Sequence, residues 1–194
     1  LKFVFFKFLR IFNKSKVKNE KKYYKSLLNN LDISSDFFVT NVYYFFKHIR
    51  NYKNFNYLEI GSYEGCSAIY IANRFKRSKI FCVDIWERVK EEYSEGINFD
   101  DIEKNFDMNS ESYLNISKIK KYSDEFFLSN NLTFDIIYVD GHHLAEQVYK
   151  DAVNSWSILN DKGLLIFDDY IWNNYDDVHK NPCYAINKFL KERH

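Results

Sequence analysis

Short apolar runs alternate with amphipathic segments from residue 57 to the end of the chain. The apolar runs are typical of buried parallel strands, and they predict strands at 57–60, 79–84, 116–119, 134–140 and 163–168. The segments between and after them predict helices at 68–74, 99–109, 123–128, 144–159 and 183–192. This alternation predicts an α/β fold, Rossmann-like, with a mainly parallel sheet and helices on both faces.

The first fifty residues have a different pattern, and we expect them to form a basic, helical N-terminal extension in front of a core at 51–194. Residues 36–50 predict a helix with an aromatic face, capped by Asp36 or Ser35. Residues 15–30 are polar and basic. Residues 1–14 are apolar with interspersed cations, and they are too short for a membrane span. They could form an amphipathic helix that lies on an anionic membrane surface or on a partner. We favour the alternative, a helix that docks on the core or on a second copy in a homo-oligomer. Because the chain begins at Leu, we expect its start to be incomplete.

Charge is distributed unevenly along the chain. Residues 1–50 hold 11 Lys/Arg and 3 Asp/Glu, a net charge of +8, whereas the remainder carries −7. An acidic core argues against a nucleic-acid groove across it. The three cysteines, Cys66, Cys82 and Cys183, are odd in number, and their spacing fits neither a CxxC pair nor a zinc site. We expect the first two to be buried free thiols, which points weakly to a reducing, cytoplasmic setting.

Glycine is scarce, with five in 194 residues, so the pair Gly61 and Gly65 stands out. They separate the first strand from its helix, as in a nucleotide-binding βαβ unit. Asp84 ends the second strand 23 residues after Gly61, near the spacing of the acid that binds a ribose hydroxyl. The alternative is a strand-end Asp that only caps a turn.

Acids also end other strands of the predicted sheet. Glu59, Asp140 and the pair Asp168 and Asp169 stand at or near strand ends, at the edge where open parallel sheets bind ligands. Asp140, Asp168 and Asp169 would converge there, and three such carboxylates would repel one another unless a cation such as Mg²⁺ neutralised them. The alternatives are that Asp140 shapes a turn and that the Asp168–Asp169 pair caps a helix or stays solvated.

These motifs together resemble class I S-adenosylmethionine-dependent methyltransferases of the small-molecule O-methyltransferase branch. The loop Glu59-Ile-Gly-Ser-Tyr-Glu-Gly65 is similar to the loop that cradles the cofactor's methionine part. The resemblance implies cofactor contacts from Glu59, Gly61, Ser62, Tyr63, Gly65, Asp84 and Ser123. It implies metal ligation by Asp140, Asp168 and Asp169, and general-base catalysis by His143 beside Asp140. The family sheet has seven strands, and this chain ends where the last two would begin.

The implied function is methyl transfer from S-adenosylmethionine to a hydroxyl of a small molecule, a sugar or a phenol, assisted by a divalent metal. One alternative is an oxidoreductase with a nucleotide cofactor, although a dinucleotide glycine loop is missing. Another is a degenerate, non-catalytic fold that binds a partner through its basic front. Trp86, Tyr170 and Trp172 could wall an acceptor pocket or pack in the core.

Overall fold

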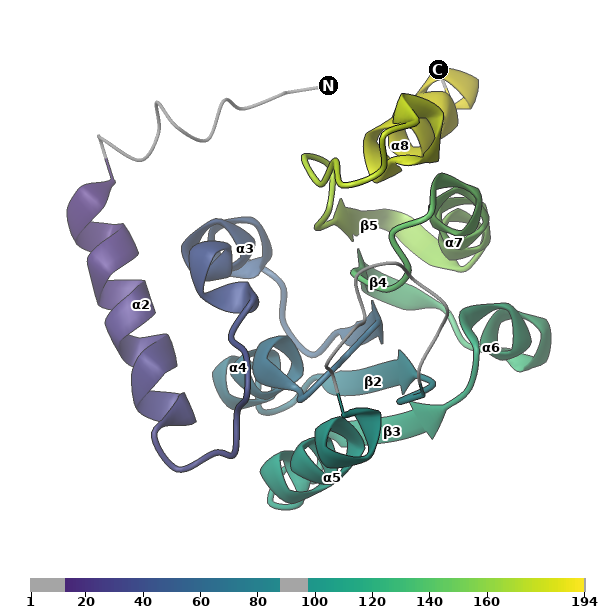
Figure 1. Cartoon of the computed structure of the whole chain (residues 1–194). Coiled ribbons are helices and arrows are strands. Elements are labelled where there is room, and N and C mark those ends of the chain that lie inside the picture. Colours follow the sequence, from purple (N-terminus) through teal and green to yellow (C-terminus); the bar gives the residue numbers. More distant parts are fainter. Residues whose placement is uncertain (1–12, 88–97, 194) are drawn as a thin grey trace.

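A five-stranded parallel sheet forms the centre of the protein (Figure 1). The computed structural model describes residues 13–87 and 98–193. Its strands are β1 (Asn56–Ile60), β2 (Lys79–Asp84), β3 (Ile116–Lys120), β4 (Phe134–Val139) and β5 (Leu159–Phe167). They lie in the order β3-β2-β1-β4-β5, and each neighbouring pair is parallel. The predicted α/β fold with a parallel sheet is therefore confirmed.

Helices cover both faces of this sheet, as predicted (Figure 1). One face carries α2 (Lys14–Leu28), α3 (Val42–Ile49), α4 (Cys66–Arg74) and α5 (Phe99–Ser110). The other face carries α6 (Ser123–Ser129), α7 (Ala145–Ser157) and α8 (Pro182–Glu192). Two 3₁₀ helices, η1 (Phe38–Thr40) and η2 (Val178–Lys180), precede α3 and α8.

The central strands read as continuous apolar runs because both of their faces are buried. Along β1, Tyr57 belongs to the apolar cluster under α3 and α4, whereas Leu58 belongs to the cluster on the opposite face. Tyr138 and Ile137 divide in the same way along β4. The carboxyl ends of these strands are thereby held rigidly at one edge, which is where the predicted site lies.

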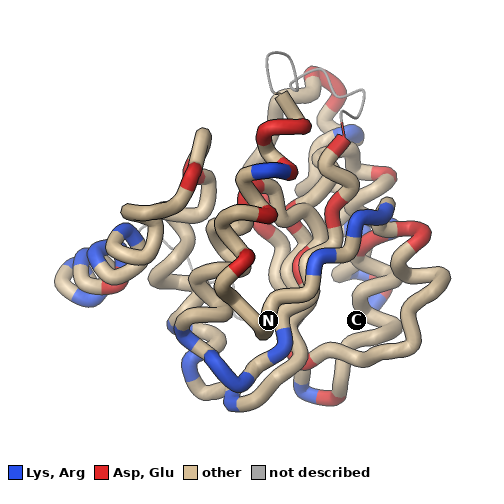
Figure 2. The backbone as a smooth tube through the Cα atoms, turned by 90° about the horizontal axis from the view of Figure 1, so that it is seen from below, with Lys and Arg blue, Asp and Glu red and all other residues tan. Residues whose placement is uncertain are grey.

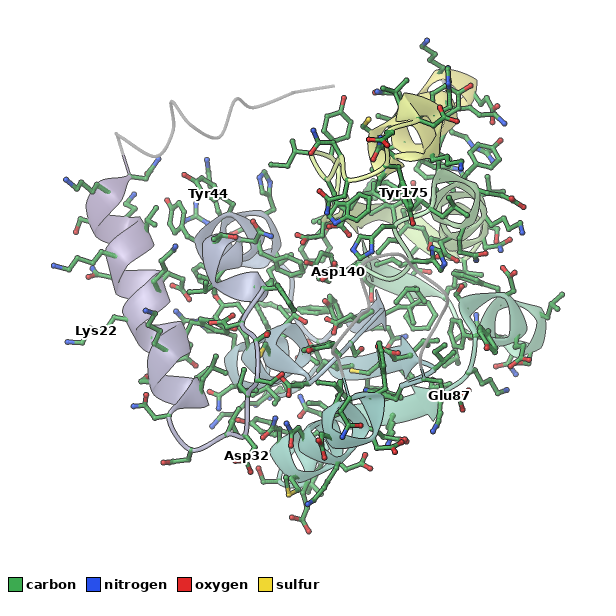
Figure 3. The ribbon with its side chains drawn as sticks, in the orientation of Figure 1. Lys22, Asp32, Tyr44, Glu87, Asp140 and Tyr175 are labelled. Carbon is green, nitrogen blue, oxygen red and sulfur yellow. The ribbon has the colours of Figure 1, made fainter. Side chains whose placement is uncertain are left out.

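The helix α2 packs on the core through Val17, Tyr24 and its single acid, Glu20. Glu20 is buried, pairs with Arg74 of α4 at 2.6 Å, and accepts a bond from the Tyr70 hydroxyl at 2.5 Å. The lysines of α2 lie on the outer side of the helix, where Lys22 points away from the molecule (Figures 2 and 3). Residues 1–12 lie outside the described part, so the membrane or oligomer contact predicted for residues 1–14 stays a prediction. No helix within 13–87 and 98–193 is both long and apolar enough to cross a membrane.

The front helix differs from its predicted form. Instead of one helix over 36–50, the chain forms η1 and then α3, with Asn41 between them. The carboxylate of Asp36 accepts a bond from the Val39 amide of η1 at 3.0 Å, but the residue that precedes α3 is Asn41, so Asp36 does not cap that helix. The break turns the chain across the sheet edge, a change of direction that helical periodicity cannot reveal.

The last strand also differs from its predicted form, because it begins at Leu159 rather than at Gly163. Leu159 lies opposite Phe134, and the next pairing joins Leu164 to Ile136. The extra residues form a bulge, in which Lys162 has a φ of +62°. Strand pairing decides such a bulge, and the local pattern suggests only a turn there.

Candidate functional site

A cavity of about 910 Å³ opens at the carboxyl edge of the sheet, a size suited to a small-molecule ligand. The glycine loop after β1, the ends of β2 and β4, and the segments that follow β3 and β5 all line it. Most of the predicted site residues line this cavity: Gly61, Ser62, Tyr63, Asp84, Ser123, Asp140, His143, Asp168 and Asp169. The strand-end acids among them, Asp84, Asp140, Asp168 and Asp169, come from the ends of three strands, β2, β4 and β5.

The glycine loop is held by the close approach of two strand ends. Gly61 has a φ of +87°, and a Cβ at this position would lie 2.1 Å from the carbonyl oxygen of Asp140. Its amide donates to the carbonyl of Val83 at 2.8 Å. Ser62 and Tyr63 line the cavity beside Gly61. The loop therefore forms one wall of the cavity.

Glu59 and Gly65 do not line the cavity. Gly65 precedes the helix α4, and Glu59 is fully buried behind the loop. One oxygen of Glu59 accepts a bond from the Tyr57 hydroxyl at 2.6 Å. Burial raises the pKa of this carboxyl to about 7. Both residues thus shape the loop from behind, and the structure places neither of them against the cavity.

Asp84 ties the end of β2 to the glycine loop. Its Oδ2 accepts the amides of Ser62 and Tyr63 at 2.9 and 3.0 Å, and its Oδ1 accepts the amide of Trp86 at 2.9 Å. A carboxylate offers about four acceptor sites, so one remains for a ligand hydroxyl. Trp86 itself is buried beside Phe106 and does not line the cavity.

The far end of the cavity is polar. Ser123 begins α6, and its hydroxyl accepts a bond from Gln147 of α7 at 3.2 Å. Gln147 also donates to Asp151, a buried acid whose pKa burial raises to about 6. The sequence analysis missed Gln147 and Asp151, although they are four positions apart and lie on the same helix face as Val148.

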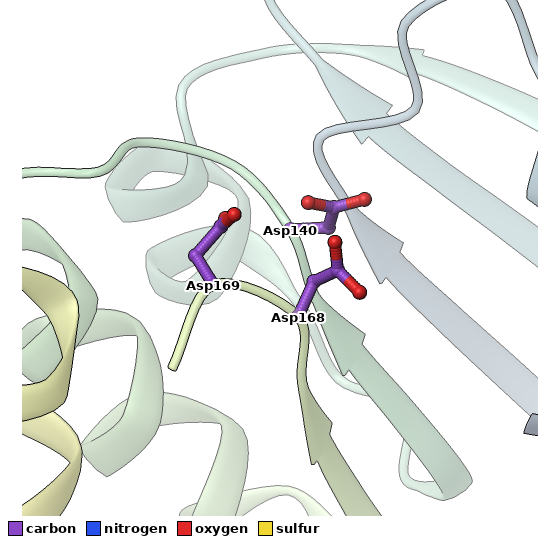
Figure 4. A group of neighbouring side chains, drawn as sticks. All are labelled: Asp140, Asp168 and Asp169. Atoms are coloured by element: carbon purple, nitrogen blue, oxygen red, sulfur yellow. The ribbon is translucent and has the colours of Figure 1, made fainter. Parts of the chain in front are cut away.

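Three carboxylates converge where β4 and β5 end (Figure 4). Asp140, Asp168 and Asp169 each offer an oxygen, and these three oxygens lie within 4.8 Å of one another. Burial, followed by the charges of Asp168 and Asp169, raises the pKa of Asp140 well above its usual value. Burial and Asp169 raise that of Asp168 to about 6. We call these three residues the acidic triad.

The acidic triad fits a hard divalent cation. A donor set made only of carboxylate oxygens suits Mg²⁺. Burial raises these pKa values first and mutual repulsion adds to it, and a bound cation would offset the repulsion. Close to the triad, the buried hydroxyl of Tyr138 has no hydrogen-bond partner within the described residues.

His143 stands at the rim of the triad. Its Nε2 lies 3.4 Å from Oδ2 of Asp169, and its ring stacks on Trp172 with centroids 4.7 Å apart and an interplanar angle of 11°. The neighbouring His142 accepts the amide of Leu144 through Nδ1 at 3.0 Å. His143 is thus oriented by an aromatic face and a carboxylate, which suits a proton acceptor.

Apolar side chains surround the mouth of the cavity. Phe37 is 66% exposed, Ile171 is 88% exposed, and both line the cavity with Trp172. Phe37 also contacts the ring of Tyr63, with centroids 5.6 Å apart. Tyr170, by contrast, bonds to Asn187 and lies outside the lining. The mouth can therefore hold the apolar face of a ring.

Two comparisons place this geometry among known proteins. A family model described as "Methyltransferase domain" matches residues 58–170. The structure is similar to that of the O-methyltransferase TomG from Streptomyces achromogenes in complex with SAM, with a TM-score of 0.59 and 11% identity. That alignment covers 91% of this chain and 76% of TomG.

Two further solved structures have the same fold. An O-methyltransferase from Bacillus cereus in complex with SAH has a TM-score of 0.57 and 14% identity, with coverage of 92% of this chain and 78% of that one. MycE, in complex with Mg, SAH and mycinamycin VI, has a TM-score of 0.57 and 18% identity. The match covers 92% of this chain and 48% of MycE, so the chain spans about half of it. No curated protein matches the sequence.

Proposed function

Because this chain belongs to the methyltransferase domain family, we propose that it transfers a methyl group from S-adenosylmethionine to a hydroxyl of a small molecule. The observation that carries the proposal is one cavity that joins the glycine loop, Asp84, the acidic triad and His143. A cofactor held along the loop would meet an acceptor held at the triad. The apolar mouth supports an acceptor with a ring, either a sugar or a phenol.

The cofactor's parts have matching groups along the cavity. The open acceptor site of Asp84 suits a ribose hydroxyl, and the polar end around Ser123 suits an adenine amine. The glycine loop, with Gly61, Ser62 and Tyr63, would lie along the methionine part. S-adenosylmethionine supplies the methyl group, and the chain's own residues bind and align it.

At the acceptor end, His143 would take the proton of the reacting hydroxyl on the ring nitrogen that does not face Asp169. Trp172 keeps the imidazole ring in one plane, and Asp169 stabilises the imidazolium that forms. The triad would hold a Mg²⁺ ion, which supplies Lewis-acid polarisation that lowers the pKa of the acceptor hydroxyl. The exposed Phe37 and Ile171 would exclude water around the acceptor.

Calorimetric titration with S-adenosylhomocysteine tests the cofactor site. We expect wild type to bind and Asp84→Asn to bind at least tenfold more weakly. The matched control is Asp135→Asn, because Asp135 also accepts a backbone amide, that of Asn56 at 2.8 Å, but at the opposite edge of the sheet. A folded wild type without binding would overturn the cofactor assignment. Binding without turnover of any acceptor would favour a non-catalytic binding module.

Titration with Mg²⁺ tests the metal role separately. We expect wild type to bind the ion and Asp168→Ala to lose this binding, because the variant keeps only two of the three carboxylate ligands of the triad. Equal binding by both proteins, or binding by neither, would rule out the triad as a metal site while leaving the cofactor site untouched.

A further inference from the structure

Asn41 comes from the N-terminal part of the chain, yet its amide lies against the acidic triad. Its Nδ2 donates to Oδ1 of Asp168 at 2.5 Å, across 127 positions of sequence. Both side chains line the cavity. A hydrogen bond to a carboxylate is among the stronger bonds in proteins, and partial burial strengthens it further. Asn41 belongs neither to the glycine loop nor to the strand-end motifs that point to the site.

The backbone of Asn41 is fixed on both sides. Its amide donates to the carbonyl of Phe38 at 2.9 Å, and its carbonyl accepts the amide of Phe45 at 2.9 Å. Phe38 is buried, and its ring contacts that of Tyr138 directly below the triad, with centroids 6.4 Å apart. Val42, the next residue, is fully buried. A side chain supported in this way can hold another group in place.

The segment 34–41, which we call the strap, is anchored at its other end to the glycine loop. Glu64 of that loop accepts the amides of Ser34 and Ser35 at 2.8 and 3.3 Å. The contact between Phe37 and the ring of Tyr63 adds to this anchor. The strap therefore runs from the predicted cofactor loop to the triad, and Asn41 is its last residue.

The bond to Asn41 restricts rotation of the Asp168 carboxylate. Figure 4 shows one oxygen of Asp168 directed toward Asp140 and the other directed away. Repulsion from Asp140 and Asp169 would otherwise favour turning the whole carboxylate outward. An amide that holds one oxygen keeps the other available to a cation, as outer hydrogen-bond partners do at metal sites.

We infer that Asn41 is a positioning residue, which pre-orients Asp168 for a divalent cation bound by the acidic triad. The inference rests on the proposed metal role of that triad. It assigns the N-terminal strap a direct part in the site, although the family model begins only at residue 58. Loss of such an outer partner weakens metal binding by about 10- to 100-fold.

The test is the Mg²⁺ affinity of the full chain, measured by calorimetry without cofactor. Asn41→Leu removes the donor at nearly constant volume. Asn160→Leu is the matched control, because Asn160 is also half-buried and donates to a carboxylate, that of Asp135 at 2.8 Å, at the opposite edge of the sheet. Thermal melts check the folding of each protein, and Asn41→Ala replaces Asn41→Leu if the leucine is not accommodated.

We expect the Asn41 variant to bind Mg²⁺ at least tenfold more weakly than wild type, and Asn160→Leu to bind within twofold. A turnover assay at saturating Mg²⁺ should then restore most of kcat, because the residue acts on metal affinity. Equal affinities of wild type and the Asn41 variant would overturn the inference and leave the metal role standing. Absence of Mg²⁺ binding by wild type would overturn both.

Discussion

Replacing Gly61 by alanine should damage the protein far more than the same change at Gly141. Gly61 has a φ of +87°, and its added Cβ would lie 2.1 Å from the carbonyl oxygen of Asp140 and 2.6 Å from the Cα of Gly141. Both of these neighbours are backbone atoms, which cannot swing aside as a side chain can. An added Cβ at Gly141 would lie 3.3 Å from the Cγ2 of Ile60 and 3.5 Å from its carbonyl oxygen, which is near ordinary van der Waals contact.

The left-handed backbone costs an alanine about 1–2 kcal/mol. Forcing a methyl group into packed backbone costs a further ~1–3 kcal/mol. A destabilisation of about 3 kcal/mol corresponds to a Tm lower by roughly 6–12 °C in a chain of this size. At Gly141, the mild contact is offset by a gain of about 0.4–1 kcal/mol from the stiffer unfolded chain, so we expect almost no change.

Thermal unfolding followed by circular dichroism, with urea titration for the free energy, measures both variants. Mg²⁺ calorimetry adds a second readout, because relief of the clash must move Asp140 and weaken binding at the triad. Melting temperatures of Gly61→Ala and Gly141→Ala within 2 °C of each other would refute the reasoning. They would show that β1 and β4 can separate at this edge without cost.

Three further predictions concern stability and rate. Arg74→Leu should lower the free energy of unfolding, measured in urea, by about 2 kcal/mol, because among the described contacts the buried charge of Glu20 would keep that with Tyr70 and lose its ion pair. This value is already reduced for the partial exposure of Arg74. An unchanged urea midpoint would contradict it. The native pKa of Glu59 is about 7 against 4.5 in the unfolded chain, so the native state binds more protons between these values and wild-type stability should fall as pH rises through that window. Glu59→Gln should remove this pH dependence, which lowers the wild-type free energy of unfolding by up to about 3 kcal/mol at pH 8. Near pH 4.5 the two proteins should be equally stable. Parallel profiles of stability against pH would refute this. His143→Gln should lower kcat by about 10²- to 10⁴-fold with an acceptor identified by screening, while Mg²⁺ affinity stays within a few-fold; an unchanged kcat would remove His143 as the base.

Local pattern in the sequence determined the elements and most of the site. The strand predicted at 79–84 is β2 residue for residue, because its inner residues, from Ile80 to Val83, form the apolar run of a strand covered on both faces. The acids at strand ends were found for a similar reason. In a parallel sheet all carboxyl ends meet at one edge, so Asp84, Asp140 and Asp168 had to converge once the strands were placed.

Tertiary structure alone decided which groups touch. Asn41 reaches Asp168 because the helix predicted over 36–50 breaks and crosses the sheet edge, and no spacing in the sequence encodes that meeting. The same holds for Glu59, whose sequence motif suggested a cofactor contact but whose side chain lies buried behind the loop. Periodicity reports how a residue sits on its own element, whereas hydrogen bonds across 127 positions and burial from every side depend on how all the elements pack together.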